Sequence, residues 1–363
     1  MSQDDSLSRP NLLGRSPHFS ALTIALVFAD PKAALVVKAV LDSLGCRAIV
    51  LARDGKELFD RLKREVIDIA VIDSGLKSMT GIECVRQIRQ LPGSNVRDMP
   101  VILLGHSKNK EDIATVRDAG ATEYMHKPFT AQALLASVHM LVERPRAFII
   151  SAGYTGPDRR VQSSFTSLLP ATSRTKCVRS QTPQIIKSLA DAAQMKEGTP
   201  LLIHPDWRLK RKMGLSVPEP LVETPVAIER VENAMDQAKE AFAASIQEEV
   251  SEILAYCRLL IQRPDRTAFI IEAIRMTASV IESRTLDLGY RRVPEVARLL
   301  REFCEQHFVI GNEFSLILLE RHALTLMAML QAGQAGDMGK AGDSLLKDLA
   351  RQVAKYNSDS LQS

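Results

Sequence analysis

The chain has 363 residues, of which 45% are hydrophobic and 25% are charged, and its formal net charge is +4. This length allows two or three domains, each with its own hydrophobic core, and the composition excludes a disordered or fibrous protein. The excess of positive charge is too small to indicate nucleic-acid binding by itself.

The N-terminal segment, residues 1–20, is polar and lacks an apolar stretch, so we expect a flexible tail rather than a signal peptide or membrane anchor. No window of about 18 uninterrupted apolar residues follows, so no transmembrane helix is predicted. The five cysteines form no CxxC pair, which argues against a zinc site or a disulfide framework. We therefore expect a reducing, cytoplasmic location and no membrane partner.

Residues 21–143 alternate short apolar runs with amphipathic stretches, which is the pattern of βαβ units. The apolar runs predict strands at Thr23–Ala29, Cys46–Leu51, Asp68–Asp73, Pro100–Leu104 and Thr122–His126. The amphipathic stretches predict helices at 32–44, 55–65, 81–90, 110–119 and 130–142. Together they predict a domain in which helices cover both faces of a five-stranded parallel sheet.

Charged side chains stand at the ends of three of these strands. Asp30 follows the first strand, Asp73 ends the third, and Lys127 follows the fifth. Because the carboxyl ends of parallel strands line one crevice, we expect two carboxylates and an ammonium group to meet there. This set suits phosphoryl transfer to a carboxylate, with one acid as the nucleophile, the other helping to hold Mg²⁺, and the lysine pairing with phosphoryl oxygens.

Residues 21–143 also resemble a response-regulator receiver domain of the CheY type, which has a flavodoxin-like fold. The resemblance is carried by Asp30, by Asp73 with Gly81 eight residues later, and by the run from Gly120 through Lys127-Pro-Phe. It covers about a third of the chain.

The resemblance implies a role for several residues. Asp73 would be the phospho-acceptor, Asp30 and the main-chain carbonyl of Gly75 would be further ligands of a Mg²⁺ ion, and Lys127 would sense the phosphoryl group. Tyr124 stands at the position of the family's rotameric switch. The implied partner is a sensor histidine kinase or a phosphotransfer protein.

Two positions depart from the family pattern. Ala29 stands where the family usually has a second acid, which weakens a cation site that depends on carboxylate charge, and Gly105 stands where it has a serine or threonine hydroxyl. The sequence is therefore compatible with a weakly phosphorylated receiver and with a degenerate receiver that only docks. His106, next to Gly105, could supply a donor to a phosphoryl group, although an exposed loop histidine is the simpler interpretation.

Residues 144–226 are rich in Pro, Ser, Thr and Arg, and we expect a basic linker. Arg159 and Arg160 end a turn-like segment that is loosely similar to an extension of some alphaproteobacterial receivers. A helix is plausible at Pro183–Met195 and a short strand at Leu201–Ile203.

A basic run follows in the same segment, beside the chain's only tryptophan, Trp207. Its members are Lys210, Arg211 and Lys212. With Arg159 and Arg160 they could contact phosphates or a partner, and a solvated basic turn is the alternative. Extended chain is expected around Pro218 and Pro220.

Residues 227–356 have the apolar spacing of amphipathic helices and predict an all-α bundle. The expected helices are 228–262, 266–285, 292–308, 312–331 and 343–355, with Pro264 ending the first and Asn312 and Asp343 capping later ones. We expect this bundle to bind protein, most simply a second copy of the chain.

The sequence gives less support to a phosphotransfer, catalytic or DNA-binding role for the C-terminal region. His322 lies in mid-helix without the flanking pattern of a phosphotransfer or kinase histidine, and no catalytic constellation follows residue 150. We therefore expect no catalytic output domain. The sequence predicts a response regulator with a protein-binding bundle; the alternative is a DNA-binding regulator whose basic linker and Arg284–Arg292 segment contact phosphates.

Overall fold

The structure is a computed structural model. It describes residues 19–91, 94–151, 153–159, 184–186, 200–203, 205, 207–216, 225–332 and 338–360. The chain divides into two compact units, Met1–Met235 and Asp236–Ser363, and each is described by itself. Within the described residues, no helix combines the length and the apolar character needed to cross a membrane.

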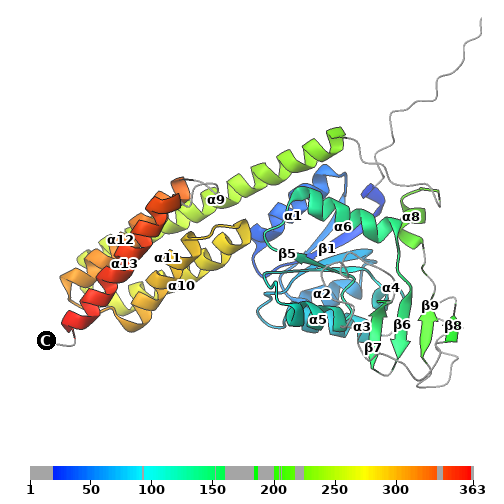
Figure 1. The fold of residues 1–363 in the computed structure, drawn as a ribbon, viewed down its shortest axis with the longest axis horizontal. Coiled ribbons are helices and arrows are strands. Elements are labelled where there is room, and N and C mark those ends of the chain that lie inside the picture. Colours follow the sequence, from blue (N-terminus) through cyan, green and yellow to red (C-terminus); the bar gives the residue numbers. More distant parts are fainter. Residues whose placement is uncertain are drawn as a thin grey trace, which may run out of the picture. The chain divides into compact units, whose positions relative to one another are not determined.

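A five-stranded parallel sheet forms the centre of the first unit (Figure 1). Its strands are β1 (Thr23–Val27), β2 (Ala48–Ala52), β3 (Ile69–Asp73), β4 (Val101–Gly105) and β5 (Glu123–His126). Their order, β2-β1-β3-β4-β5, is flavodoxin-like, as predicted, and every neighbouring pair is parallel. All five predicted strands are confirmed to within two residues at each end.

Helices cover both faces of this sheet (Figure 1). The short 3-10 turn η1 (Phe19–Ala21) precedes β1, and the helices are α1 (Pro31–Ser43), α2 (Gly55–Leu62), α3 (Gly81–Gln90), α4 (Ser94–Arg97), α5 (Lys110–Asp118) and α6 (Ala131–Glu143). Local capping explains where they begin: Thr80 and Glu83 form a capping box for α3, and Asp54 and Asn109 cap α2 and α5.

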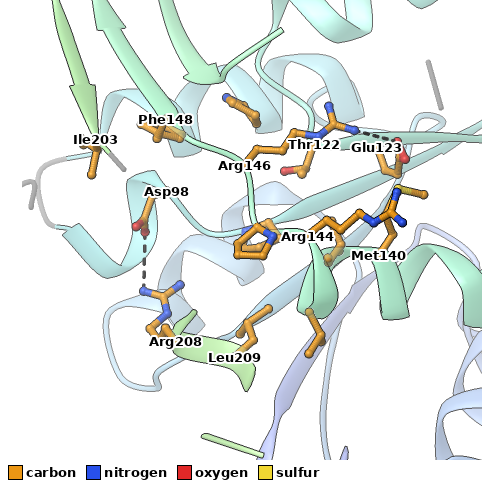
Figure 2. A pocket seen from close by; sticks show the side chains of 15 residues that line it. Asp98, Thr122, Glu123, Met140, Arg144, Arg146, Phe148, Ile203, Arg208 and Leu209 are labelled. Atoms are coloured by element: carbon orange, nitrogen blue, oxygen red, sulfur yellow. Dashed lines mark ion pairs between the residues drawn. The ribbon is translucent and has the colours of Figure 1, made fainter. Parts of the chain in front are cut away.

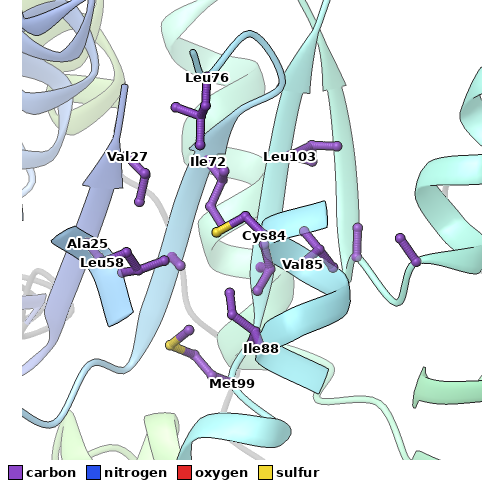
Figure 3. Close-up of a cluster of buried hydrophobic side chains, with 14 of the residues drawn as sticks. Ala25, Val27, Leu58, Ile72, Leu76, Cys84, Val85, Ile88, Met99 and Leu103 are labelled. Carbon is purple, nitrogen blue, oxygen red and sulfur yellow. The ribbon is translucent and has the colours of Figure 1, made fainter. Parts of the chain in front are cut away.

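The hydrophobic core lies where α2 and α3 pack on alternate residues of the central strands (Figure 3). Val27, Ile72 and Leu103 point to this side, and Cys84 and Ile88 of α3 cover them. Strand residues of the opposite parity, such as Leu26 and Val71, are also fully buried. Burial on both faces explains why these strands read as continuous apolar runs.

A second sheet, of order β7-β6-β9-β8, lies in the segment expected to be a linker. Its strands are β6 (Phe148–Ser151), β7 (Tyr154–Pro157), β8 (Gln184–Ile186) and β9 (Leu201–Ile203). The strand expected at Leu201–Ile203 is confirmed. The helix expected at Pro183–Met195 is corrected, since Gln184–Ile186 is a strand paired in parallel with β9; the rest of that range, like Pro218 and Pro220, lies outside the described residues.

Arg89 of α3 joins the two sheets. It is 2% exposed, donates to the carbonyls of Gly120 (2.9 Å) and Met99 (2.7 Å), and lies 5.6 Å from the ring of Phe148 in β6. Burial lowers its pKa to about 10, so the guanidinium stays charged near neutral pH. The second sheet is therefore packed on the first and does not behave as a linker.

The second unit contains the greater part of α9 (Pro225–Gln262) and the remaining helices. These are η3 (Pro264–Arg266), α10 (Thr267–Leu288), α11 (Val293–Gln306), α12 (Glu313–Gln331) and α13 (Gly339–Ser360). α10 packs on α11, and α12 and α13 pack on α11 and on each other. The predicted helical bundle is confirmed, and α9 ends before Pro264 as expected.

The two predicted caps in the bundle have different outcomes. Asn312 caps α12, because its Oδ1 accepts from the N–H groups of Phe314 (2.9 Å) and Ser315 (3.2 Å). Asp343 is not a cap; it lies inside α13 and forms an ion pair with Arg292 at 2.6 Å. The prediction was wrong because α13 begins at Gly339, four residues before Asp343.

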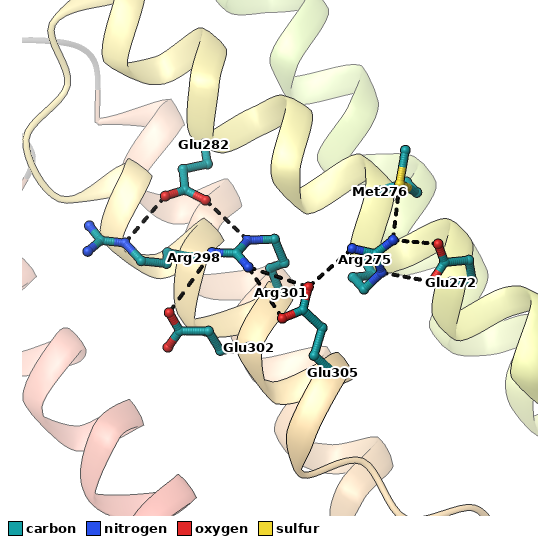
Figure 4. Close-up of polar contacts among 8 residues, drawn as sticks. All are labelled: Glu272, Arg275, Met276, Glu282, Arg298, Arg301, Glu302 and Glu305. Carbon is teal, nitrogen blue, oxygen red and sulfur yellow. Dashed lines mark hydrogen bonds and ion pairs between the residues drawn. The ribbon is translucent and has the colours of Figure 1, made fainter. Parts of the chain in front are cut away.

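Ion pairs connect α10 with α11 along one side of the bundle (Figure 4). Arg275 binds Glu272 of its own helix and Glu305 of α11 at 3.1 Å, and Glu282 pairs with Arg301 at 3.4 Å. Each exposed pair contributes little by itself. Repeated along the contact, they favour one register of the two helices.

Candidate functional site

Asp73 and Lys127 meet at the carboxyl edge of the first sheet. Asp73 is the last residue of β3, and Lys127 directly follows β5, where its N–H donates to the carbonyl of Gly105 at 2.8 Å. Lys127 Nζ lies 2.9 Å from Asp73 Oδ2. The lysine side chain is only 3% exposed, whereas that of Asp73 is 13% exposed. The carboxylate is thus reachable from solvent while its counter-charge is held inside the fold.

The other predicted acid, Asp30, caps α1 directly after β1. The N–H of Lys32 donates to its Oδ1 at 2.9 Å. The N–H of Gly75 similarly donates to Asp73 Oδ1 at 3.2 Å. The structure therefore places Asp73 at the end of β3, and Asp30 and Gly75 in the loops that follow β1 and β3, at the carboxyl edge of the sheet.

These groups suit a hard cation chemically, because all of them offer oxygen. Mg²⁺ keeps several waters and binds through one or two carboxylates, so its oxygen chemistry is compatible with the carboxylates of Asp30 and Asp73 and the carbonyl of Gly75. Ala29 removes the third acid. The described residues contain no group of three or more His, Cys, Asp or Glu side chains that could hold a metal without help from main-chain oxygens or water.

Tyr124 occupies the space beside Gly105. A Cβ atom built on Gly105 would lie 2.9 Å from Tyr124 Oη and 3.1 Å from Ser74 Oγ. Tyr124 Oη donates to the carbonyl of Ser107 at 2.8 Å, and burial raises the pKa of the phenol, so it remains a donor. Sequence reasoning did not single out Ser74; its hydroxyl next to Asp73 was the only signal.

The basic run lies in a short helix, α8 (Arg208–Lys212), whose lysines form ion pairs with acidic residues of the same unit. Lys210 is 1% exposed and lies 3.2 Å from Glu143 of α6, and Lys212 Nζ lies 2.6 Å from Asp68, just before β3. The structure thus places both lysines in internal ion pairs at the amino edge of the sheet. Arg211 is exposed.

Arg159 also has a role within the unit. Its guanidinium lies 3.6 Å from the centre of the Tyr154 ring and binds Asp118 of α5. Arg159 thus ties the end of β7 to the first sheet. Arg160 lies outside the described residues.

A pocket of about 80 Å³ lies between the two sheets (Figure 2). Thr122, one of its lining residues, directly precedes β5, so the pocket is at the edge opposite Asp73. Arg146 pairs with Glu123 at 3.7 Å and Arg208 with Asp98 at 3.6 Å at its walls. These pairs stabilise the junction of the sheets and give the pocket no link to the acid–lysine site.

Most of the residues that could have given the helical bundle other roles are used in its own contacts. His322 is fully buried, its Nδ1 lies 2.7 Å from the carbonyl of Leu318, and its ring stacks on Phe303. A phosphoryl group cannot reach it. Arg284 pairs with Glu249, where both side chains are largely buried, and Arg292 pairs with Asp343 at the surface, so these two arginines connect helices of the bundle, whereas Arg291 is exposed.

The comparisons with known proteins identify the family of the first unit. The family model of the response regulator receiver domain matches residues 24–139. A chemotaxis protein CheY homologue of Campylobacter jejuni is 32% identical over 100 residues, which cover 75% of that protein and 27% of this chain. The chain belongs to the response regulator receiver family. The receiver predicted at 21–143 is therefore confirmed as a module of two-component signalling.

Further relatives include longer response regulators. It is 33% identical over 104 residues to the two-component response regulator PhoP of Pseudomonas aeruginosa. The chain spans 44% of PhoP and 40% of the response regulator MprA of Mycolicibacterium vanbaalenii. The solved receiver domain of a sensor histidine kinase from Pseudomonas aeruginosa, with magnesium in its active-site cleft, is 30% identical over 32% of this chain and 94% of that one, with a TM-score of 0.30.

Proposed function

We propose that this chain is a cytoplasmic response regulator whose receiver accepts a phosphoryl group on Asp73 and whose helical bundle is a protein-binding output. The Asp73–Lys127 pair carries this proposal. A partly exposed carboxylate can attack a phosphorus atom, and a buried ammonium 2.9 Å away can neutralise the charge that arrives with it.

The chemistry needs little more from the protein than position and charge. Transfer from a phosphohistidine forms a P–O bond to a carboxylate oxygen of Asp73 and breaks the donor's P–N bond, whose electron pair leaves with the imidazole nitrogen. Lys127 then pairs with a phosphoryl oxygen. A bound Mg²⁺, held by Asp30, Asp73 and the carbonyl of Gly75, would supply further positive charge to the phosphoryl oxygens. The donor would be a sensor histidine kinase or a phosphotransfer protein.

The alternative is a degenerate receiver that docks its partner without being modified. Ala29 and Gly105 support it, because one acid and one hydroxyl of the family pattern are absent. The two alternatives differ in whether Asp73 ever carries a phosphoryl group.

The full chain incubated with acetyl phosphate and Mg²⁺ should gain the mass of one phosphoryl group. The Asp73→Asn variant should gain none, because its amide is a poor nucleophile. Intact mass spectrometry measures both. An unmodified wild type, with a CheY-type receiver as the positive control, would establish the docking alternative instead.

An exposed apolar stripe on α10 supports the protein-binding output. Phe269, Met276 and Val280 are 74%, 53% and 40% exposed. Their spacing of seven and four residues places them on one face of the helix. Apolar side chains that recur at this spacing on an exposed face favour association with another helix, and we propose a second copy of α10 as the partner. DNA binding has less support, because two of the three arginines that suggested it, Arg284 and Arg292, form ion pairs within the bundle, although Arg291 is exposed.

A further inference from the structure

Two side chains, Tyr124 and Ser74, lie where Gly105 has no side chain at the end of β4, and both bring a hydroxyl there. Gly105 is buried, and a Cβ atom placed on it would lie 3.1 Å from Ser74 Oγ. A side chain hydroxyl at position 105 would extend from that Cβ atom by one bond. Ser74 Oγ is therefore close to the place that such a hydroxyl would occupy.

The backbone holds Ser74 firmly in this place. Its N–H donates to the carbonyl of Leu104 in β4 at 2.8 Å, and its carbonyl accepts from the N–H of Gly81, the first residue of α3, at 3.1 Å. Ser74 also directly follows Asp73 in the chain. Two hydrogen bonds thus fix the backbone of Ser74 between β4 and α3, one residue after the predicted phospho-acceptor.

The neighbouring hydroxyl, that of Tyr124, is directed elsewhere. Tyr124 Oη donates to the carbonyl of Ser107 at 2.8 Å. Ser74 Oγ, by contrast, makes no hydrogen bond to another group within the described part of the chain. Because it is half-buried, an acceptor that enters the site would gain a donor already in position.

We propose that Ser74 is a catalytic residue of this receiver, which donates its hydroxyl hydrogen to an oxygen of the phosphoryl group on Asp73. The inference rests on the proposed phosphorylation of Asp73. Lys127 would bind one phosphoryl oxygen and Ser74 another. The Ser74 hydroxyl would then compensate for the absence of a hydroxyl at position 105. Gly105 leaves space for it, and Ser74 supplies the hydrogen bond to the phosphoryl group.

The test compares Ser74→Ala with Ser74→Thr in the full chain. Acetyl phosphate and Mg²⁺ are added, and the initial rate of phosphoryl incorporation is followed by intact mass. Loss of a hydrogen bond to a charged group should slow Ser74→Ala roughly tenfold or more, and Ser74→Thr should restore most of the rate because it keeps the hydroxyl. Equal melting temperatures would show that both variants are folded.

A second measurement separates donation to the ligand from mere space filling. Beryllofluoride with Mg²⁺ imitates the phosphoryl group, and its affinity can be followed by ¹⁹F NMR. Ser74→Ala should bind it at least several-fold more weakly than Ser74→Thr. If the wild type is phosphorylated and Ser74→Ala matches it in rate and affinity, the inference fails while the proposed function stands. If the wild type is not phosphorylated, both fail.

Discussion

At the scale of single residues, Gly105 determines how Tyr124 lies. A Cβ atom at this position would meet Tyr124 Oη at 2.9 Å and Cε2 at 3.0 Å, closer than side chains normally approach. Gly105→Ala should therefore displace the ring and lower the free energy of unfolding by roughly 1 to 3 kcal/mol, the usual cost of overpacking. The shift of the urea midpoint, monitored by Trp207 fluorescence, measures it.

Gly75→Ala is the matched control for that change. A Cβ atom on Gly75 would meet only Asp73 Oδ1, at an ordinary 3.8 Å, and Gly75 is exposed. Its urea midpoint should stay near that of the wild type. If Gly105→Ala also left the urea midpoint unchanged, Tyr124 would be able to move aside without a loss of stability. Its contact with position 105 would then not explain the glycine.

At the scale of elements, the α10 stripe gives the sharpest prediction. Phe269→Glu places a charge in the proposed contact between two copies of α10, so the dimer should weaken at least tenfold, because burial of one large apolar side chain is worth about 1.5 to 3 kcal/mol. Sedimentation velocity over a range of concentrations measures the dissociation constant.

A control on another helix makes this result specific. Leu324 of α12 is 52% exposed, and Leu324→Glu adds the same charge to the bundle outside the α10 stripe. It should leave the dissociation constant unchanged. A wild-type chain that stays monomeric at all concentrations, or equal effects of the two substitutions, would refute α10 as the dimer contact.

Elements also show what the sequence could predict. The strands of the first sheet are apolar runs between helical stretches, and the long helices of the bundle have a period of three to four residues, so both could be predicted. In the second sheet the sequence predicts only β9; β6, β7 and β8 have three or four residues each and lie in a segment whose composition suggests a linker. Only tertiary contacts stabilise them, such as that between Arg89 and Phe148, which the local pattern does not contain.

The candidate site shows the same limit. Asp30, Asp73 and Lys127 could be predicted because each stands at a strand end, where topology alone brings them to one edge. The ion pair of Lys212 with Asp68 joins residues 144 positions apart, and the place of Ser74 Oγ beside Gly105 depends on side-chain geometry. Neither follows from residue type or spacing, which is why the sequence alone allowed both phosphate contacts and a solvated basic turn for the basic run.

At the scale of the whole molecule, the two units should respond differently to acid. His322 is fully buried in the second unit, and desolvation lowers its pKa to about 4 from the ordinary 6.5. The folded bundle therefore favours the neutral imidazole, whereas the unfolded chain takes up a proton below about pH 6.5. Stability from this residue is complete above pH 6.5 and is lost as the pH falls toward 4.

Between pH 7.5 and 5 this linkage should lower the free energy of unfolding of the bundle by roughly 2 kcal/mol. Asp343, whose pKa is lowered by its hydrogen bond to Arg292, titrates below this window. Far-UV circular dichroism during urea unfolding reports mainly on the helical bundle, and Trp207, the only tryptophan, reports on the first unit in the same sample. His322→Gln should abolish the acid sensitivity of the bundle without changing the Trp207 transition; a bundle equally acid-sensitive after the substitution would assign the effect to other groups.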